Sequence, residues 1–483
     1  MTTTNGTRKI LDLKRWEMAC PAPTATVAAA FIASSRHSKQ QQLYVVNATT
    51  AYLYNPYEDG WSQLASPALA GTFAAGACGV ATAVGPTGTA SAGSTTSITT
   101  NLTLARDLRG FSVHFTAGTN AGLTLVIASN TIGSNAVIRF TTTQGVAFDN
   151  TSVYRLLTPR WYVLNAITAS GTTTANVFKY YDYATNAWVA AETGGTDGVA
   201  PAAVIGTDSK LISTPSWIDT GYKQFATGTA TAGGASTLTN SGKSWTTNQW
   251  ANAYQVRIVS GTGAGQIRPI ASNTGTALTV SSAWGTNPDA TSVYSIEGND
   301  DFIYYMGSNA VTLYRYSISG GAWSTVTPSP TARAAAPGAG MSGHWAWGCT
   351  EADWTDESAI QNGRYIYSFR GAAGTALDRY DIALNTWTSP LTYSPWSEFF
   401  TTGSKYVYSQ DAIYIQKDVT GRWLRFDIPK ANLDGWGWMG HTQGAAVLGD
   451  TAFDVVYHDG ATEIVFVHMV LNTSTVHLRQ MVI

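Results

Sequence analysis

The segment Tyr380-DIALNT-Trp387 belongs to a repeat that decides the fold of this chain. In each regular copy, an aromatic residue stands seven positions before a tryptophan, with polar and turn-forming residues between them. The regular copies are Tyr54 to Trp61, Tyr181 to Trp188, Tyr316 to Trp323 and Tyr380 to Trp387. Two looser copies are Phe426 to Trp436 and Leu11 to Trp16. Self-similarity of this kind indicates that one small structural unit is used several times.

A stretch of alternating aromatic residues precedes most copies of the repeat. These stretches are LYVVNA (43–48), WYVLNA (161–166), FIYYMG (302–307), YIYSFRG (365–371) and YVYSQD (406–411). Alternation over a short run, bounded by Gly, Asn and Ser, is typical of strands joined in hairpins. Each unit therefore predicts a small antiparallel sheet.

The composition agrees with an all-β chain. Of its 483 residues, 47 are Gly, 24 are Tyr and 17 are Trp, and only 12% are charged, about half the usual share. Aromatic and β-branched residues favour strands, whereas Gly and Asn favour turns. A helical bundle, a coiled coil and a disordered chain are all excluded by this composition, because disorder requires few aromatic residues and a high net charge.

Charge and hydropathy exclude several classes of partner. The net charge is −2, without the clustered Lys and Arg that duplex nucleic acid requires, so sequence-specific nucleic-acid binding is not expected. No stretch approaches 18 apolar residues, so no membrane span is expected. The N-terminal stretch lacks the apolar run of a secretory signal. Cys20, Cys78 and Cys349 lie far apart and predict partly buried thiols.

The repeat also resembles a known family. Radial stacking of four-stranded sheets would bury faces that one sheet alone leaves exposed. The pattern Tyr-Asp-x5-Trp, clearest at Tyr181 to Trp188 and Tyr380 to Trp387, resembles kelch-type β-propellers, although the double glycine of that family is mostly missing. The resemblance implies about six blades, with tryptophans wedged between them. The implied blade anchors are Trp16, Trp61, Trp188, Trp323, Trp387 and Trp436.

Two insertions are indicated by the distances between tryptophans. Trp323, Trp387 and Trp436 follow one another at 64 and 49 residues, whereas the earlier intervals are 127 and 135 residues. The excess is an internal duplication at an offset of 140–143 residues. The matching segments are Gly88-TASAG with Gly228-TATAG, Thr119-NAG with Thr262-GAG, Ala128-SNT with Ala271-SNT, and Asp149-NTSVY with Asp289-ATSVY.

These matches predict two small β-barrel or β-sandwich domains, module 1 (residues 88–156) and module 2 (residues 228–297). The propeller would then consist of residues 1–87, 157–227 and 298–483. Both modules precede the same strand of their blades, so we expect them side by side on one rim. Three strands near the C-terminus (453–459, 463–471 and 476–483) need a fourth to complete a blade, and Lys9-ILDLKRW could supply it.

Module 2 carries a resemblance of its own. The segment Ser260-GTGAGQIRPIASNTGTALTVSSAW resembles a short β repeat of tailed-bacteriophage structural proteins, and module 1 keeps only its frame. A generic Gly/Thr-rich β repeat is the alternative interpretation. The resemblance implies a virion protein.

Candidate chemistry is sparse. Seven histidines are scattered without metal-binding spacing, and no Walker loop, GxSxG or GxGxxG motif follows a strand. The carboxylates of EADWTDE (351–357) surround Trp354, an arrangement that suits glycoside hydrolysis, a cation site or an ordinary solvated loop. We therefore predict no enzymatic activity, no catalytic set, no metal and no cofactor. Trp345, Trp347 and Trp354 are the candidate partner or glycan contacts.

The sequence favours a structural protein of a tailed-phage virion, in the tail, nozzle, neck or baseplate, assembled in the host cytoplasm. Such a protein would bind other virion proteins and copies of itself in a symmetric ring. Propeller-bearing tail-tube or nozzle proteins of short-tailed phages are similar in kind. Three alternatives stay open: a carbohydrate- or receptor-binding protein that contacts host-surface glycans, a kelch-type oxidase or lyase, and a cellular interaction scaffold.

Overall fold

The computed structural model describes a large part of the chain, and every structural statement below concerns that part. The described residues are 17–18, 30–34, 43–47, 50–55, 60–64, 78–82, 84–167, 175–191, 210–213, 224–251, 254–298, 302–306, 313–325, 345–348, 365–369, 376–381, 386–392, 405–409, 412–416, 422–427, 436–441, 452–458, 463–471 and 476–482. Within them the regular structure is all strand, arranged in several antiparallel sheets. No helix of the described residues is long and apolar enough to cross a membrane.

Five of the sheets have four strands each and follow the chain closely. Their strands, sheet by sheet, are β2 (Ala30–Ser34), β3 (Leu43–Asn47), β4 (Thr50–Asn55) and β5 (Gly60–Gln63); β6 (Cys78–Thr82), β14 (Arg160–Ile167), β15 (Ala175–Asp182) and β16 (Ala187–Ala190); β17 (Lys210–Ser213), β25 (Phe302–Met306), β26 (Leu313–Ser317) and β27 (Ala322–Thr325); β28 (Trp345–Gly348), β29 (Tyr365–Phe369), β30 (Ala376–Asp381) and β31 (Thr386–Thr392); β32 (Lys405–Ser409), β33 (Ala412–Gln416), β34 (Arg422–Asp427) and β35 (Trp436–His441).

A sixth four-stranded sheet joins the two ends of the described chain. Its strands are β36 (Ala452–His458), β37 (Glu463–Leu471), β38 (Val476–Val482) and β1 (Glu17–Met18). The N-terminal strand pairs with the last one, with Glu17 opposite Gln480 and Met18 opposite Arg479. The strand expected at residues 9–16, including the anchor Trp16, lies outside the described residues. The pairing is made by the two residues that follow it.

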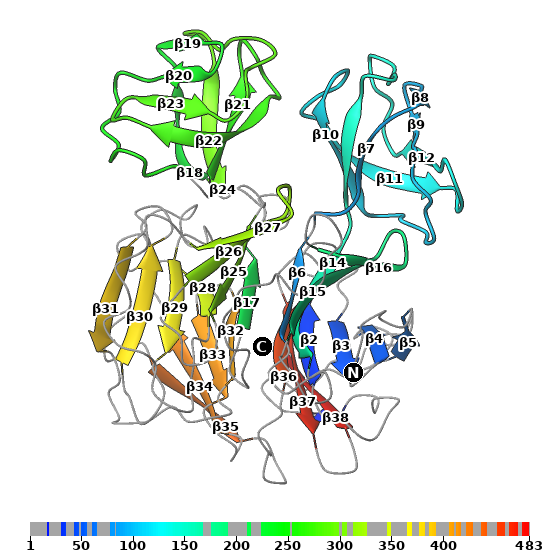
Figure 1. Ribbon diagram of the computed structural model, residues 1–483, viewed down its shortest axis with the longest axis vertical. Coiled ribbons are helices and arrows are strands. Elements are labelled where there is room, and N and C mark those ends of the chain that lie inside the picture. The colour runs from blue at the N-terminus through cyan, green and yellow to red at the C-terminus, as the bar shows by residue number, and fades with distance from the viewer. Residues whose placement is uncertain are drawn as a thin grey trace.

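The six sheets form a closed circle. Their first strands lie next to one another in the order β2, β6, β17, β28, β32 and β36, and β36 lies next to β2 again. Figure 1 shows these sheets grouped in the lower part of the molecule, with both seven-stranded sheets above them. We call this circle of four-stranded sheets the ring.

Modules 1 and 2 each contain one seven-stranded sheet with the same strand order. In module 1 the order is β7 (Thr87–Thr89), β13 (Val153–Leu157), β10 (Ser112–Ala117), β11 (Thr124–Asn130), β12 (Val137–Phe140), β9 (Ser97–Thr99) and β8 (Ala92–Gly93). In module 2 it is β18 (Gln224–Thr229), β24 (Val293–Gly298), β21 (Tyr254–Ser260), β22 (Ile267–Asn273), β23 (Ala277–Val280), β20 (Thr237–Thr239) and β19 (Ala232–Gly234).

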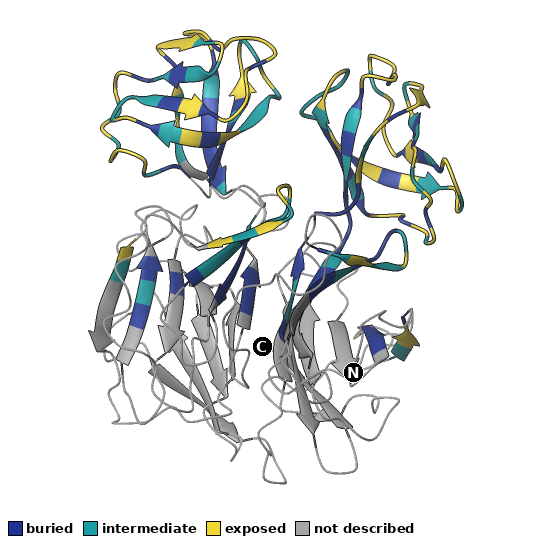
Figure 2. Ribbon diagram, viewed as in Figure 1, coloured by how far each residue is buried: buried dark blue, intermediate teal, exposed yellow. Residues whose placement is uncertain are grey.

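β-Bulges bend the two module sheets at equivalent places. The register shifts after Phe115 and Ile127 in module 1, and after Ile258 and Ile270 in module 2. A bulge bends its strand and increases the local twist, so each sheet curls around its own apolar residues. Figure 2 shows the result, with buried residues inside the strands and exposed residues on the loops. In module 1 the core includes stacked Phe115 and Phe148, whose ring centroids are 4.5 Å apart.

The aromatic–tryptophan repeat forms a cross-strand pair in every sheet where it occurs. The regular copies place the two residues directly opposite each other in Tyr54–Trp61, Tyr181–Trp188, Tyr316–Trp323 and Tyr380–Trp387. Their ring centroids lie 4.9, 5.6, 5.3 and 5.2 Å apart. Phe426 and Trp436 are opposite each other in the same way. The seven-residue spacing thus corresponds to a short turn between two paired strands.

These pairs also contact the preceding sheet of the ring. The Trp323 ring lies 4.9 Å from that of Phe178 on β15, and the Tyr316 ring lies 4.8 Å from it. The Tyr316 hydroxyl donates a hydrogen bond to the Ala191 carbonyl oxygen at the end of the same preceding sheet. Trp188 packs on the cluster that contains Leu53 of β4, again one sheet earlier. The repeat therefore provides much of the contact between neighbouring sheets.

Removing one of these rings should weaken the ring of sheets. Trp323→Ala deletes a half-buried indole that touches both its own sheet and Phe178, and should cost about 2–3 kcal/mol, somewhat below the cost for a fully buried tryptophan. The exposed Val189, truncated to Ala, should change stability by less than about 0.5 kcal/mol. Midpoints of urea unfolding followed by tryptophan fluorescence measure both effects. Equal midpoints for the two variants would contradict the packing role.

Candidate functional site

Modules 1 and 2 interrupt the ring at the same topological place. Module 1 lies between β6 and β14, and module 2 lies between β17 and β25, which are the first and second strands of two neighbouring sheets. Both modules consequently stand at the same end of the ring (Figure 1). The sheet of module 1 covers residues 87–157 and that of module 2 covers 224–298, slightly more than the repeated sequence.

The repeated Asp-x-Thr-Ser segment closes a tight turn in module 1. Asp149 Oδ1 accepts hydrogen bonds from the Thr151 amide at 2.8 Å and from the Thr151 hydroxyl at 2.6 Å. Asp149 Oδ2 accepts one from the Thr119 hydroxyl at 2.8 Å. The Ser152 hydroxyl donates to the Thr119 carbonyl oxygen at 3.1 Å and accepts from the Asp149 amide at 3.2 Å. The turn is thereby tied to the loop at Thr119.

Module 2 builds the same turn. Asp289 Oδ1 accepts from the Thr291 amide at 2.8 Å and from its hydroxyl at 2.6 Å. The Ser292 hydroxyl donates to the Thr262 carbonyl oxygen at 2.6 Å. Because the same bonds recur, the duplicated residues hold backbone in place. Their conservation between the copies reflects a preserved shape.

Both turn aspartates are more acidic than usual. Hydrogen bonds from Thr151 lower the pKa of Asp149 below its ordinary value of 3.8, and those from Thr291 lower the pKa of Asp289 in the same way. These bonds favour the charged carboxylate, which accepts hydrogen bonds better than the neutral acid.

This shift predicts acid sensitivity of the modules. A depressed folded-state pKa contributes stability above the unfolded value, and the contribution is lost as pH falls through the folded-state pKa, here below about pH 4. We expect Asp149→Asn and Asp289→Asn to lower the melting temperature at neutral pH, and the difference from the unmodified chain to shrink as pH decreases below about 4. Melting curves from neutral pH down into this acid range measure it. A difference independent of pH would contradict the assignment.

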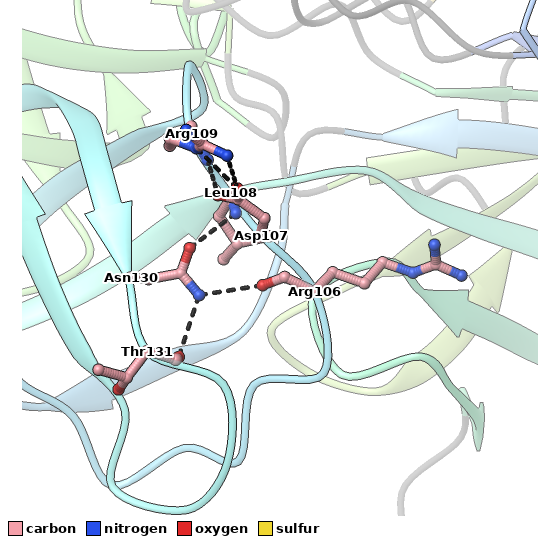
Figure 3. A network of polar contacts seen from close by, with 6 residues as sticks. All are labelled: Arg106, Asp107, Leu108, Arg109, Asn130 and Thr131. Carbon is pink, nitrogen blue, oxygen red and sulfur yellow. Dashed lines mark hydrogen bonds and ion pairs between the residues drawn. The ribbon is translucent and has the colours of Figure 1, made fainter.

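A second repeated residue, asparagine in Ser-Asn-Thr, fixes a loop in each module. In module 1, Asn130 Oδ1 accepts the Leu108 amide at 2.7 Å, and its Nδ2 donates to the carbonyl oxygens of Arg106 at 2.9 Å and Thr131 at 3.1 Å (Figure 3). In module 2, Asn273 Oδ1 accepts the Trp250 amide at 2.8 Å, and Nδ2 donates to the Thr246 carbonyl oxygen at 2.9 Å. One side chain thus satisfies several backbone groups.

Asn130→Asp tests this function with almost no change in shape. A carboxylate would face the carbonyl oxygens of Arg106 and Thr131 without a proton to donate, which should cost about 1–3 kcal/mol. Hydrogen exchange should increase in the loop 101–111 and stay unchanged in 241–250. Asn273→Asp is the matched control and should show the opposite pattern. Exchange that increases equally in both loops for either variant would contradict separate loop anchors.

The phage-like segment of module 2 is explained by the turn between β21 and β22. Gly261, Gly263 and Gly265 have φ values of 79°, 80° and 88°, a left-handed backbone that favours glycine. Gln266 Oε1 accepts the Gly285 amide at 2.7 Å, and Nε2 donates to the Thr286 carbonyl oxygen at 2.8 Å. Two side-chain atoms of one residue therefore hold the loop that follows β23.

Arg268 holds the same loop, 281–287, against the β21–β22 turn. Its Nε donates to the Ala283 carbonyl oxygen at 3.0 Å. Burial lowers the pKa of Arg268, and its guanidinium lies 5.8 Å from the centre of the Trp284 ring. Module 1 has Leu123 where module 2 has Gln266. There Asn120 Nδ2 donates to the Val146 carbonyl oxygen at 3.0 Å, which ties down the equivalent loop by other means.

Module 1 is also fastened to the ring by an arginine. Arg106 Nη2 donates to the Tyr181 hydroxyl at 2.9 Å and to Asn186 Oδ1 at 3.1 Å, and its guanidinium lies 4.9 Å from the centre of the Tyr183 ring. The Ala105 amide donates to the Ala184 carbonyl oxygen at 2.9 Å. We call these contacts the arginine clamp. Sequence reasoning missed the clamp because Arg106 belongs to no repeated segment.

The other predicted contact residues lie elsewhere. Trp345 and Trp347 belong to β28, the first strand of its sheet, and share one face because they are two positions apart. Trp354, the acidic segment 351–357 and His344 lie outside the described residues. Cys78 is a buried thiol, whereas Cys20 and Cys349 lie outside the described residues. Within the described ranges, no group of three or more His, Cys, Asp or Glu side chains is arranged to hold a metal ion.

Comparison with known proteins leaves the family open. No protein-family model and no curated protein matches the chain. A putative oxidoreductase (glucose dehydrogenase) from Thermus thermophilus has a TM-score of 0.35 and 10% identity, over 97% of this chain and 99% of that one. The GH74 xyloglucanase of Xanthomonas campestris scores 0.33 at 11% identity, over 95% and 54%. Apo AztD of Citrobacter koseri scores 0.25 at 9%, over 94% and 95%. Similarity this low carries no functional argument.

Proposed function

We propose that the chain is a six-bladed, kelch-like β-propeller with inserted modules at residues 88–156 and 228–297, and that it is a structural component of a tailed-phage virion. In this proposal it occupies the tail, nozzle, neck or baseplate and reaches the virion from the host cytoplasm. It contacts other virion proteins and further copies of itself in a symmetric ring. Its role would be mechanical and not enzymatic.

One observation carries the proposal: two copies of the same module stand at one end of the ring with the same internal hydrogen bonds. The residues kept in both copies, such as Asp149 with Asp289 and Asn130 with Asn273, support backbone turns. Duplication therefore preserved a shape and its presentation. A shape presented twice at one end suits contact with a partner assembly.

The phage-like segment of module 2 supports the same proposal. Its glycines and its Gln266 form a compact hairpin that fixes the neighbouring loop. Scaffolding of this kind needs no reactive group, because protein–protein contacts act through surface complementarity. The arginine clamp adds to this, since it orients module 1 on its sheet and so defines the surface that the end of the ring would present.

Virion incorporation tests the proposal. In particles purified from a culture that produces this chain, we expect the chain at a fixed ratio to the major structural proteins. Arg106→Ala loses the arginine clamp and should reduce incorporation severalfold, because module 1 would no longer be held in one orientation. Arg109→Ala, in the same loop, removes only an exposed contact with Asp107 and should leave incorporation unchanged.

Quantitative mass spectrometry of gradient-purified particles gives the ratio, and sedimentation velocity of the isolated chain gives its self-association. Absence of the unmodified chain from purified particles would refute the virion role. Equal incorporation of the Arg106 and Arg109 variants would remove the arginine clamp from the argument.

A further inference from the structure

The two modules expose one equivalent turn each toward the other. The turn 118–123 of module 1 and the turn 261–266 of module 2 share their backbone hydrogen bonds. The Gly122 amide donates to the Phe115 carbonyl oxygen at 2.7 Å, and the Gly265 amide donates to that of Ile258 at 2.8 Å. Both glycines have a φ of 88°. They are the same position of the repeat, 143 residues apart.

These two glycines meet each other across the gap between the modules. A Cβ placed on Gly122 would lie 2.1 Å from the Gly265 carbonyl oxygen and 2.5 Å from the Gly265 Cα. A Cβ placed on Gly265 would lie 3.0 Å from the Ala121 carbonyl oxygen. The backbones are therefore in direct contact, through the same position in both copies. We call this contact the glycine seam.

The two modules differ in how they are fastened to the ring. In module 2 the residue equivalent to Arg106 is Thr246, because its carbonyl oxygen is the one that accepts the repeated asparagine amide. On the ring, the Tyr183 position is occupied by Ile318 in the next sheet, and the Asn186 position by Gly321. The turn itself is the same, since Asn186 and Gly321 have φ values of 53° and 59°.

Every side chain of the arginine clamp except its tyrosine is thus replaced around module 2. The guanidinium donor, the stacking ring and the amide acceptor have all changed together. The remaining tyrosine, Tyr316, donates its hydroxyl to the Ala191 carbonyl oxygen. A threonine hydroxyl near an isoleucine and a glycine cannot reproduce a charge-assisted, ring-stacked contact.

We propose that module 2 is a hinged unit whose orientation is set by the glycine seam, whereas module 1 is the fixed reference that the arginine clamp holds on the ring. The seam acts as a latch. When it is closed, both modules form one platform. When it opens, module 2 turns about its two connections to β17 and β25 while module 1 stays in place. This inference concerns the chain itself and does not depend on a virion role.

Distances between spin labels in the full chain test the latch. Exposed positions suit the labels: Thr143 in module 1, Ser282 in module 2 and Ser62 in the ring, each replaced by Cys. Cys20 and Cys349 are replaced by Ser, and the buried Cys78 is kept. Two doubly labelled chains, 143 with 62 and 282 with 62, report each module against the ring by pulsed electron paramagnetic resonance.

Gly122→Ala should broaden the 282–62 distance distribution and move its maximum, and should leave the 143–62 distribution unchanged. Gly265→Ala, whose Cβ is less crowded, should do the same to a smaller extent. Gly133→Ala is the matched control, because Gly133 also has a positive φ, of 111°, but a Cβ there meets nothing within 4 Å. Arg106→Gln should broaden the 143–62 distribution instead.

Two results would overturn the proposal. One is a 282–62 distribution for Gly122→Ala that matches that of Gly133→Ala. The other is broadening of both distributions to the same extent, which would mean that module 1 is no more fixed than module 2. Since these readouts require no partner, they stay informative even if the chain is absent from virions.

Discussion

Contact between neighbouring sheets is the interaction on which the rest of this structure depends. A four-stranded sheet has two faces, and each becomes buried only when another sheet lies against it. The Tyr316–Trp323 pair shows how the chain achieves this, because one strand turn brings both rings together and Phe178 of the preceding sheet receives them. Repeating that arrangement around a circle covers the faces in turn. The same geometry also provides two equivalent openings into which extra sequence could be inserted.

The modules show how a fold keeps its shape with few apolar residues. Their glycine- and threonine-rich sequences bury a modest core, and much of the backbone is held by side-chain oxygens and amides. A single asparagine or aspartate in each copy satisfies two or three backbone or hydroxyl groups that would otherwise lack partners. Because these bonds are local, each module can be presented on a long strand pair without losing its form.

Sequence reasoning captured what is repeated and missed what is not. The spacing between Tyr181 and Trp188 carries the strand pairing, since only a short antiparallel turn places them opposite each other. The constant offset between copies identified two modules with one topology. The arginine clamp and the glycine seam gave no signal, because a single Arg106 resembles any surface arginine and Gly265 resembles any turn glycine. Contacts between units depend on how the units are placed, which a local pattern does not contain.

The pairing of Glu17 and Met18 with the strand Val476–Val482 has a consequence for biosynthesis. A ribosome delivers the N-terminal partner first and the C-terminal partner hundreds of residues later, so the circle cannot close while the chain is still growing. Until then, the first sheet has no neighbour on one side and its apolar face is open to solvent or to other nascent chains. Contacts this distant in sequence also form slowly. Expression at low temperature, or with a holdase chaperone, should accordingly favour the closed form over aggregates.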